Sequence, residues 1–258
     1  TYVYATLTPT TSIISISHNA TSPLKAGNTL TVTLIGVANG TATFDIGTLT
    51  AGRAMTQVSP GTYTGSYLVV AGNNVKDAIV TGHLLIGTTT YSLAATPTVT
   101  FDTIVPTFTI TVSPDPAKAG TVSIVVIASE QLTGTPTLIA RDSANGTIST
   151  VLLIGDNLVF TYSGTIATAQ GTATVKVSGA DLAGNSGSKT TTFQVDTIPA
   201  TFTITVPVCV KEGTFSLKIT ANEKLKGTPS VTIKDSNGCS TIAFELISSA
   251  NSVFEYRG

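Results

Sequence analysis

The sequence contains no Trp, one Met, two His and two Cys, and only 10% of its 258 residues are charged. Ordinary soluble domains have about 25% charged residues. The formal net charge of −1 leaves no basic face with which to displace counterions, so we expect no nucleic-acid partner. No apolar run approaches the roughly 18 residues that span a bilayer, so no membrane span is predicted. The scarcity of His and Cys points away from an enzyme, because these side chains carry much general acid–base and nucleophilic chemistry.

Thr and Ser together account for about 73 residues, and hydrophobic residues make up 41% of the chain. That hydrophobic content is enough for packed cores, so the composition does not indicate disorder. β-Branched Thr, Val and Ile suit a strand that faces a core on one side and water on the other. The composition is therefore typical of a secreted or cell-surface β protein, and the expected location is extracellular.

The chain repeats itself, and the repeats set the domain organisation. FTITV occurs at 108–112 and again at 202–206, and EQLTGTP at 130–136 returns as EKLKGTP at 223–229. A more distant copy precedes them, because GTYTGSY around Tyr63 matches FTYSGTI around Tyr162. These matches predict three domains, at residues 1–102, 103–196 and 197–258.

Within the second repeat, hydrophobic residues alternate with the period of two that half-buried strands require. The predicted strands are 107–113, 121–129, 137–143, 147–155, 158–167, 172–179 and 189–196, separated by turns rich in Gly, Pro, Asn and Asp. The residues expected to face the core are Ile110, Val112, Val125, Ile127, Val175 and Val177. Seven short strands in such a segment predict an all-β fold of three tandem immunoglobulin-like β-sandwich domains.

The segments SEQL, GTPT, FTYSGTIATAQGTATVKVSGADLAGNSG and the closing VDT-x-P resemble bacterial and archaeal immunoglobulin-like repeats of surface-layer proteins, large adhesins and secreted multidomain proteins. The segments PLKAGNTLTVTL and VSPGTYTGSY of the first repeat resemble a related module. The resemblance implies a non-enzymatic structural protein outside the cell: a segment of a surface layer, a fibre or an adhesin stalk. Its expected partners are copies of itself or further domains of the same polypeptide.

The alternative is a carbohydrate- or surface-binding accessory module of a secreted enzyme. Such a module would display exposed aromatic rings. Tyr63, Tyr162 and Tyr256 instead occupy matching positions in the three repeats, which indicates a packing requirement of the fold.

Calcium is the one cofactor that the sequence suggests. In a sandwich of this topology the loop after the second strand and the loop after the sixth emerge at the end where the chain enters. Asp102, Glu130, Asp181 and Asn185 should therefore meet at that end, and hard oxygen ligands suit Ca²⁺. The alternative is that Asp181 and Asn185 form a hydrogen-bonded turn while Asp102 caps the backbone of the next strand.

Three further groups of residues have two interpretations each. Cys209 and Cys239 are predicted to form a disulfide within the third domain, with free thiols as the alternative. Asn19, Asn39 and Asn145 begin glycosylation sequons, although chance alone predicts about three in this composition and Asn-Gly pairs are typical of tight turns. His18 and His83 lack the sequence setting of a catalytic nucleophile and are expected to be incidental strand residues, so no catalytic residue is predicted.

The third repeat ends at Gly258, where the second continues through two more strands. We expect one of two explanations: a fragment of a longer polypeptide, or a gap filled by a strand from a neighbouring copy. Residues 1–10 are the candidate donor strand. Because Thr1 is not an initiator Met, any signal peptide is expected to have been removed.

Overall fold

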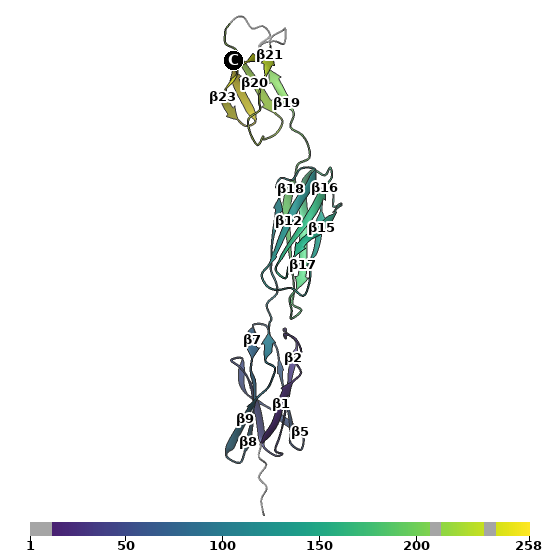
Figure 1. Cartoon of the computed structure of the whole chain (residues 1–258), viewed down its shortest axis with the longest axis vertical. Helices are drawn as coiled ribbons and strands as arrows, with labels where there is room; N and C mark the ends of the chain where they lie inside the picture. The colour runs from purple at the N-terminus through teal and green to yellow at the C-terminus, as the bar shows by residue number, and fades with distance from the viewer. Residues whose placement is uncertain (1–11, 207–212, 235–240) are drawn as a thin grey trace, which may run out of the picture. The chain divides into compact units, whose positions relative to one another are not determined.

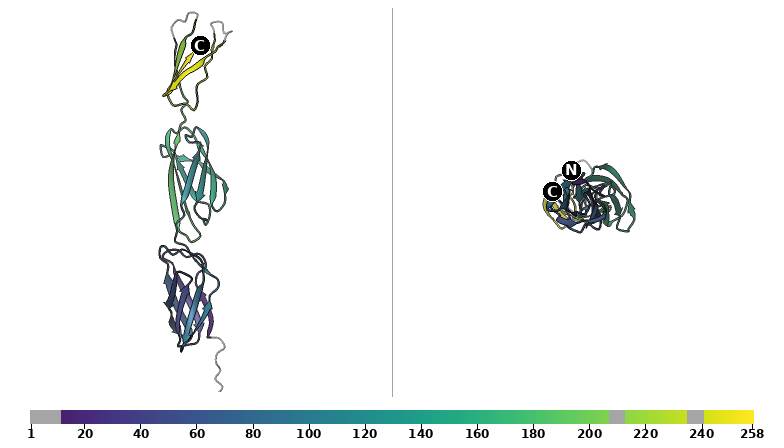
Figure 2. Two further views of the ribbon diagram at one scale, coloured as in Figure 1. Left: turned by 90° about the vertical axis from the view of Figure 1, so that its left-hand side faces the viewer. Right: turned by 90° about the horizontal axis from the view of Figure 1, so that it is seen from below.

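The computed structural model describes residues 12–206, 213–234 and 241–258, and all regular elements in these ranges are β-strands. The chain divides into two compact units, residues 1–196 and 197–258. The first unit holds two β-sandwiches with separate hydrophobic cores, and the second unit holds a third sandwich. The strands of each sandwich lie in two layers (Figures 1 and 2). The fold is thus three tandem immunoglobulin-like sandwiches, as predicted.

The first sandwich packs the sheet β1-β2-β6-β5 against the sheet β4-β3-β8-β9, with a small β10-β7 sheet at one end. Its inward-facing residues alternate along the strands, as Leu30, Val32 and Leu34 do on β2. The strands are β1 (Ile13–His18), β2 (Thr29–Gly36), β3 (Thr41–Ile46), β4 (Thr50–Ala54), β5 (Thr56–Ser59), β6 (Thr62–Leu68), β7 (Val75–Ala78), β8 (Val80–Ile86), β9 (Thr89–Ala94) and β10 (Val99–Phe101).

The second sandwich packs β11-β12-β16-β15 against β14-β13-β17-β18, and its core includes Phe160, Val175 and Phe193. All of its pairings are antiparallel except an isolated parallel bridge between Ala117 and Val195. The strands are β11 (Phe108–Ser113), β12 (Gly120–Ala128), β13 (Thr137–Arg141), β14 (Thr147–Ile148), β15 (Thr150–Gly155), β16 (Val159–Ile166), β17 (Gly171–Ala180) and β18 (Ser186–Val195).

Two details of the second sandwich differ from the sequence-based expectation. The predicted strand 147–155 is split at Ser149, because β14 pairs with β13 in one sheet and β15 pairs with β16 in the other. On β12 the buried residues are Val122, Ile124, Val126 and Ala128, whereas Val125 is half-buried and Ile127 is exposed. The expectation for Val125 and Ile127 was wrong because every residue of the run IVVIA is apolar, on either face of the strand. The pattern therefore does not show which face is buried, and a shift of one residue exchanges the two faces.

In the third sandwich, the described residues form the sheet β19-β20-β24-β23 and a two-stranded β21-β22 sheet. A small core gathers around Leu217, Ile219, Phe254 and Tyr256. The strands are β19 (Phe202–Thr205), β20 (Ser216–Ala221), β21 (Ile233–Lys234), β22 (Thr241–Ile242), β23 (Glu245–Ala250) and β24 (Val253–Arg257). Residues 1–10, the predicted donor strand, lie outside the described residues.

Candidate metal centre

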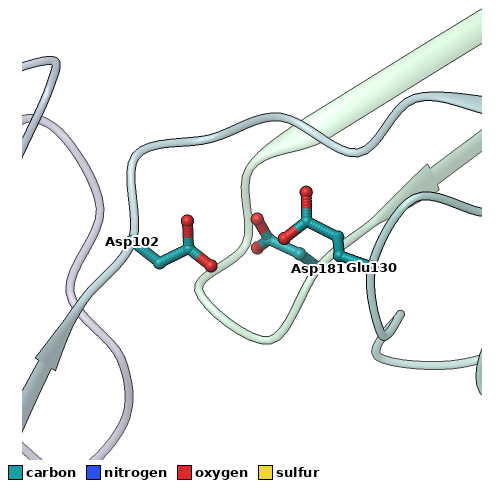
Figure 3. A group of neighbouring side chains, drawn as sticks. All are labelled: Asp102, Glu130 and Asp181. Atoms are coloured by element: carbon teal, nitrogen blue, oxygen red, sulfur yellow. The ribbon is translucent and has the colours of Figure 1, made fainter. Parts of the chain in front are cut away.

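Three acidic residues from separate segments converge beside the linker that leads into the second sandwich. Asp102 directly follows β10, Glu130 lies in the loop after β12, and Asp181 begins the turn after β17. One carboxylate oxygen of each lies within 4.8 Å of the others, and Figure 3 shows the three side chains directed toward one another. The chain topology accounts for the meeting, because both loops emerge at the end of the sandwich that the linker enters.

The turn from Asp181 to Asn185 is held by its own hydrogen bonds. The Asn185 N–H donates to Asp181 Oδ1 at 2.9 Å, and Asn185 Nδ2 donates to Asp181 Oδ2 at 2.7 Å. Gly184 adopts a φ of +83°, which L side chains rarely tolerate. Asp181 is 1% exposed, so its carboxylate is fixed in place and almost completely withdrawn from water.

Asn185 also holds the linker, because its Nδ2 donates a second bond to the Asp102 carbonyl oxygen at 2.9 Å. Both partners of this nitrogen are acceptors only, which fixes the orientation of the amide group. Asn185 is predicted as a metal ligand, and both of these bonds come from its Nδ2, so its Oδ1 is the atom that could bind a cation. The role of Nδ2 in this geometry is to position the Asp181 carboxylate and the Asp102 backbone.

The linker packs closely against the second sandwich beyond Asp102. The Asp102 carboxylate accepts a hydrogen bond from the Ile104 N–H at 3.0 Å, which is the capping arrangement expected as the alternative to a metal site. A Cβ atom on Gly187 would overlap the Pro106 carbonyl oxygen, so only glycine permits this approach. The Thr107 N–H donates to Ser129 Oγ at 2.9 Å. Together with the bond from Asn185 to the Asp102 carbonyl oxygen, the Pro106 and Thr107 contacts join the linker to the second sandwich at three points.

The three carboxylates repel one another. Burial raises the pKa of Glu130 above its ordinary value of 4.5, and the negative charges of Asp102 and then Asp181 raise it further. Within the described ranges none of the three forms an ion pair with Lys or Arg. The nearby Lys25 instead donates from Nζ to the Gly184 carbonyl oxygen at 2.7 Å. In the described part of the chain no Lys or Arg is thus in ion-pair contact with the cluster, although Lys76 lines the same cleft.

A cleft of about 510 Å³ opens beside the cluster and includes all three acidic residues in its lining. Carboxylate oxygens are hard ligands, and Ca²⁺ accepts six to eight of them in tolerant geometry, completing its shell with water. Asp102, Glu130 and Asp181 could each supply at least one oxygen, and the cleft gives solvent a way in. The donor set therefore fits calcium better than zinc, which prefers nitrogen and sulfur ligands.

The sequence-based search missed a second polar cluster on the first sandwich. His83 Nε2 lies 2.9 Å from Asp45 Oδ2, and His83 Nδ1 lies 2.7 Å from Ser92 Oγ. All residues of β9, including Ser92, are exposed, so the cluster lies on the open outer face of a sheet. The sequence offered one clue, because His83 and Ser92 lie on either side of the turn at 87–88, where a hairpin would bring them opposite each other. In the structure the two residues pair directly across β8 and β9. His18 is unrelated to it, because its Nε2 lies 2.7 Å from the Pro97 carbonyl oxygen.

The sequon asparagines all occupy structural positions. Asn39 and Asn145 adopt positive φ angles of 64° and 66° in tight turns. The Asn19 side chain accepts from the Thr31 N–H at 2.8 Å and donates to the Thr29 carbonyl oxygen. Cys209 and Cys239, the predicted disulfide pair, lie outside the described residues.

The matching tyrosines do not form a carbohydrate-binding platform. Tyr63, Tyr162 and Tyr256 are 1%, 5% and 5% exposed, and each hydroxyl donates to a backbone carbonyl oxygen. A sugar ring stacks on an accessible aromatic face, which these buried rings do not offer. The packing interpretation of the three tyrosines agrees with these contacts.

No protein-family model matches the sequence, and no curated protein matches it. Solved structures to which the chain is similar include three tandem immunoglobulin domains of titin, at 16% identity over 91% of this chain and 83% of that one, with a TM-score of 0.45. A tetra-tandem repeat from the extending region of a large adhesion protein is 19% identical over 94% of this chain and 64% of that one, with a TM-score of 0.37.

A Ca²⁺-stabilised adhesin with which an Antarctic bacterium binds ice is 19% identical, with a TM-score of 0.44. That match covers 96% of this chain and 66% of the adhesin, so the chain spans about two thirds of the length of both adhesin structures.

The described residues contain no helix with the length and apolarity needed to cross a membrane.

Proposed function

We propose that the chain is a non-enzymatic structural segment of an extracellular assembly, such as an adhesin stalk, a fibre or a surface layer. In this proposal, calcium bound by Asp102, Glu130 and Asp181 fixes the linker to the second sandwich. The observation that carries the proposal is the convergence of three carboxylates on a linker, with the pKa of Glu130 raised by burial and by its acidic neighbours.

The physical reason for a cation here is electrostatic. Without one, ionised Asp102, Glu130 and Asp181 oppose the close approach of the linker and both loops. A bound Ca²⁺ turns that repulsion into three attractive contacts and leaves the Asn185 bonds intact. A tandem protein that transmits tension along its length benefits from a linker that does not swing freely, because inter-domain motion is the default for small interfaces.

The test of the calcium proposal is calorimetric unfolding of residues 1–258 after removal of divalent ions, with and without added Ca²⁺. A ligand at 100 times its dissociation constant stabilises the folded state by about 2.7 kcal/mol, which corresponds to roughly 10–20 °C for a domain the size of the second sandwich. Mg²⁺ should give a smaller shift because it demands a tighter octahedral shell. Unchanged melting of the native sequence with Ca²⁺ would overturn the calcium site.

Two variants make that test specific. Asp181→Asn should remove most of the Ca²⁺-dependent shift, since it deletes the most buried carboxylate of the group. Asp156→Asn is the matched control, because Asp156 lies in the β15–β16 turn and only bonds the N–H groups of Leu158 and Val159. The control should unfold at a lower temperature than the native sequence, but Ca²⁺ should raise its unfolding temperature by the same amount.

The structural role is tested separately by locating the protein in its native cells. Antibodies against the folded chain should label the outer surface or released fibres in immunogold electron microscopy. Labelling confined to the cytoplasm would contradict the proposed extracellular role, whatever the outcome with calcium.

A further inference from the structure

The edge strand β15 of the second sandwich exposes a run of apolar side chains. Val151, Leu153 and Ile154 are 64%, 61% and 71% exposed. No charged residue occurs from Thr147 to Gly155. β15 is the last strand of its sheet, and among the described residues no strand pairs with its outer edge. An edge of this kind presents unpaired N–H and C=O groups together with apolar surface.

The exposed apolar surface continues across the outer face of the same sheet. Val159 on β16 and Ile127 on β12 are both exposed, and the two residues pair directly in the sheet. With Val151, Leu153 and Ile154 they form what we call the β15 patch. A contiguous apolar patch on a protein surface marks an interaction site more often than a scattered single residue does.

The other sandwiches show that the fold does not require this patch. The strand corresponding to β15 is β5 in the first sandwich and β23 in the third, and each carries a β-bulge at the same place, between Gln57 and Ser59 and between Leu246 and Ser248. Both equivalent strands expose an apolar bulge residue, Val58 or Ile247, as β15 does with Leu153. They carry Thr56 or Glu245 in place of Val151, and Ser59 or Ser248 in place of Ile154. Because shorter or more polar sequences satisfy the same position, the VLLI run of β15 calls for a role beyond packing.

The remaining edges of the second sandwich carry features that oppose pairing. β18 has Lys189 within the strand, β14 has only two residues, and β11 is flanked by Pro106 and Pro114. Lysine, short length and proline are the devices by which native sheets protect their edges. β15 has only its bulge between Leu152 and Ile154, which twists the strand locally.

We propose that the β15 patch is the site at which two copies of this chain associate, with β15 pairing antiparallel to β15 of the second copy. Such a contact is two-fold symmetric and self-complementary, so it needs no other partner. The uncharged strand meets itself without like-charge repulsion. Because the bulge limits the backbone ladder, most of the contact comes from Val151, Leu153 and Ile154.

The charge at the end of β15 favours this antiparallel arrangement. Asp156 directly follows the strand, and no charged residue occurs from Thr147 to Gly155. Antiparallel pairing places Asp156 of each copy near the uncharged beginning of β15 in the other and keeps the two aspartates apart. A parallel arrangement would place like charges together. Arg141 ends β13 in the other sheet and donates to Thr147 Oγ1 and the Asn145 carbonyl oxygen of its own hairpin. Asp142, next to Arg141, is turned into its own loop and accepts from the Ala144 and Gly146 N–H groups.

The test is sedimentation velocity of residues 1–258 over a concentration series, with chelator and with Ca²⁺, so that failure of the calcium site does not affect the outcome. The native sequence should show a concentration-dependent dimer in both conditions. Leu153→Lys and Ile154→Lys should each weaken dimerisation roughly tenfold or more, because each places an uncompensated charge from both copies in the apolar contact. Val58→Lys is the matched control, since Val58 is the exposed bulge residue of β5, and it should leave the dimer unchanged.

Hydrogen exchange identifies the surface independently. Amides of Thr150–Gly155 should become more protected as concentration rises, whereas those of β5 should not. A chain that remains monomeric throughout, as it would if the patch served a different protein, overturns the proposal. So does a dimer that Leu153→Lys and Ile154→Lys leave intact, because its interface must then lie elsewhere.

Discussion

The Tyr63 hydroxyl donates a hydrogen bond to the Val37 carbonyl oxygen at 2.7 Å and accepts one from the Gly40 N–H at 2.9 Å. The matching Tyr162 donates to the Pro136 carbonyl oxygen at 2.9 Å. In each case a buried ring reaches the backbone of the loop that crosses from its own sheet to the other. The repeated tyrosine therefore anchors the crossover between the two sheets of its sandwich, and burial raises the pKa of Tyr162 above its ordinary value of 10.

Tyr162→Phe should lower the free energy of unfolding by about 1–2 kcal/mol, because the buried Pro136 carbonyl loses its donor while the ring remains in place. Tyr91→Phe is the control, since Tyr91 is exposed on β9 and its change should stay within about 0.5 kcal/mol. Urea unfolding followed by circular dichroism measures both. Equal stability of Tyr162→Phe and the native sequence would contradict a structural role for the hydroxyl.

Asn185→Ala should destabilise the second sandwich by about 1–3 kcal/mol. It removes two donors, so the buried Asp181 carboxylate and the Asp102 carbonyl both lose a partner. Leu182→Ala lies in the same turn but alters an exposed side chain, and it should have little effect. Differential scanning calorimetry compares the two. A larger loss from Leu182→Ala than from Asn185→Ala would show that the turn is not held by the asparagine.

Without divalent ions, stability should fall as pH rises through the raised pKa of Glu130. The folded chain binds more protons than the unfolded one between the ordinary value of 4.5 and the raised folded value, so the cost of ionising Glu130 is fully present above that window. Glu130→Gln should therefore be more stable than the native sequence at neutral pH and equal to it in acid. Thermal melts at a series of pH values give this difference, and parallel curves for the two proteins would contradict it.

The first sandwich should show the opposite pH dependence at lower pH. Hydrogen bonding from the Gly52 N–H, aided by His83, lowers the pKa of Asp45 below its ordinary value of 3.8. The stabilisation is present above 3.8 and is lost as pH falls through the lowered value. Asp45→Asn should therefore be less stable than the native sequence near neutral pH, with the difference shrinking in strong acid. Asp77→Asn, at an exposed position, is the control and should follow the native curve.

Much of the architecture could be predicted because local signals and the repeats agree. In the second sandwich, the predicted strand 107–113 is β11 (Phe108–Ser113), and 158–167 is β16 (Val159–Ile166). Thr, Val and Ile alternate there between Gly- and Asn-containing turns, so the period of two has one interpretation. Where consecutive residues are all apolar, as around Val125 and Ile127, the pattern could not decide which face of the strand is buried.

The candidate site was accessible to sequence reasoning only in part. The meeting of Asp102, Glu130 and Asp181 follows from connectivity, since loops at one end of a sandwich lie near one another. The orientation of the Asn185 amide depends on which acceptors surround it, and local sequence carries no record of that. The contacts of His83 with Asp45 and Ser92 likewise depend on strand register.

The number of repeats, the strand-rich fold and the positions of most turns follow from the amino-acid sequence alone, because they depend on short-range alternation and on φ angles that Gly, Asn and Pro favour. Three other features depend on long-range packing. Tertiary structure chose Val126 over Ile127 for the core, moved the chain from one sheet to the other at Ser149 and left the apolar β15 at an open edge. These outcomes depend on packing between residues far apart in the chain, and local preference is neutral toward them.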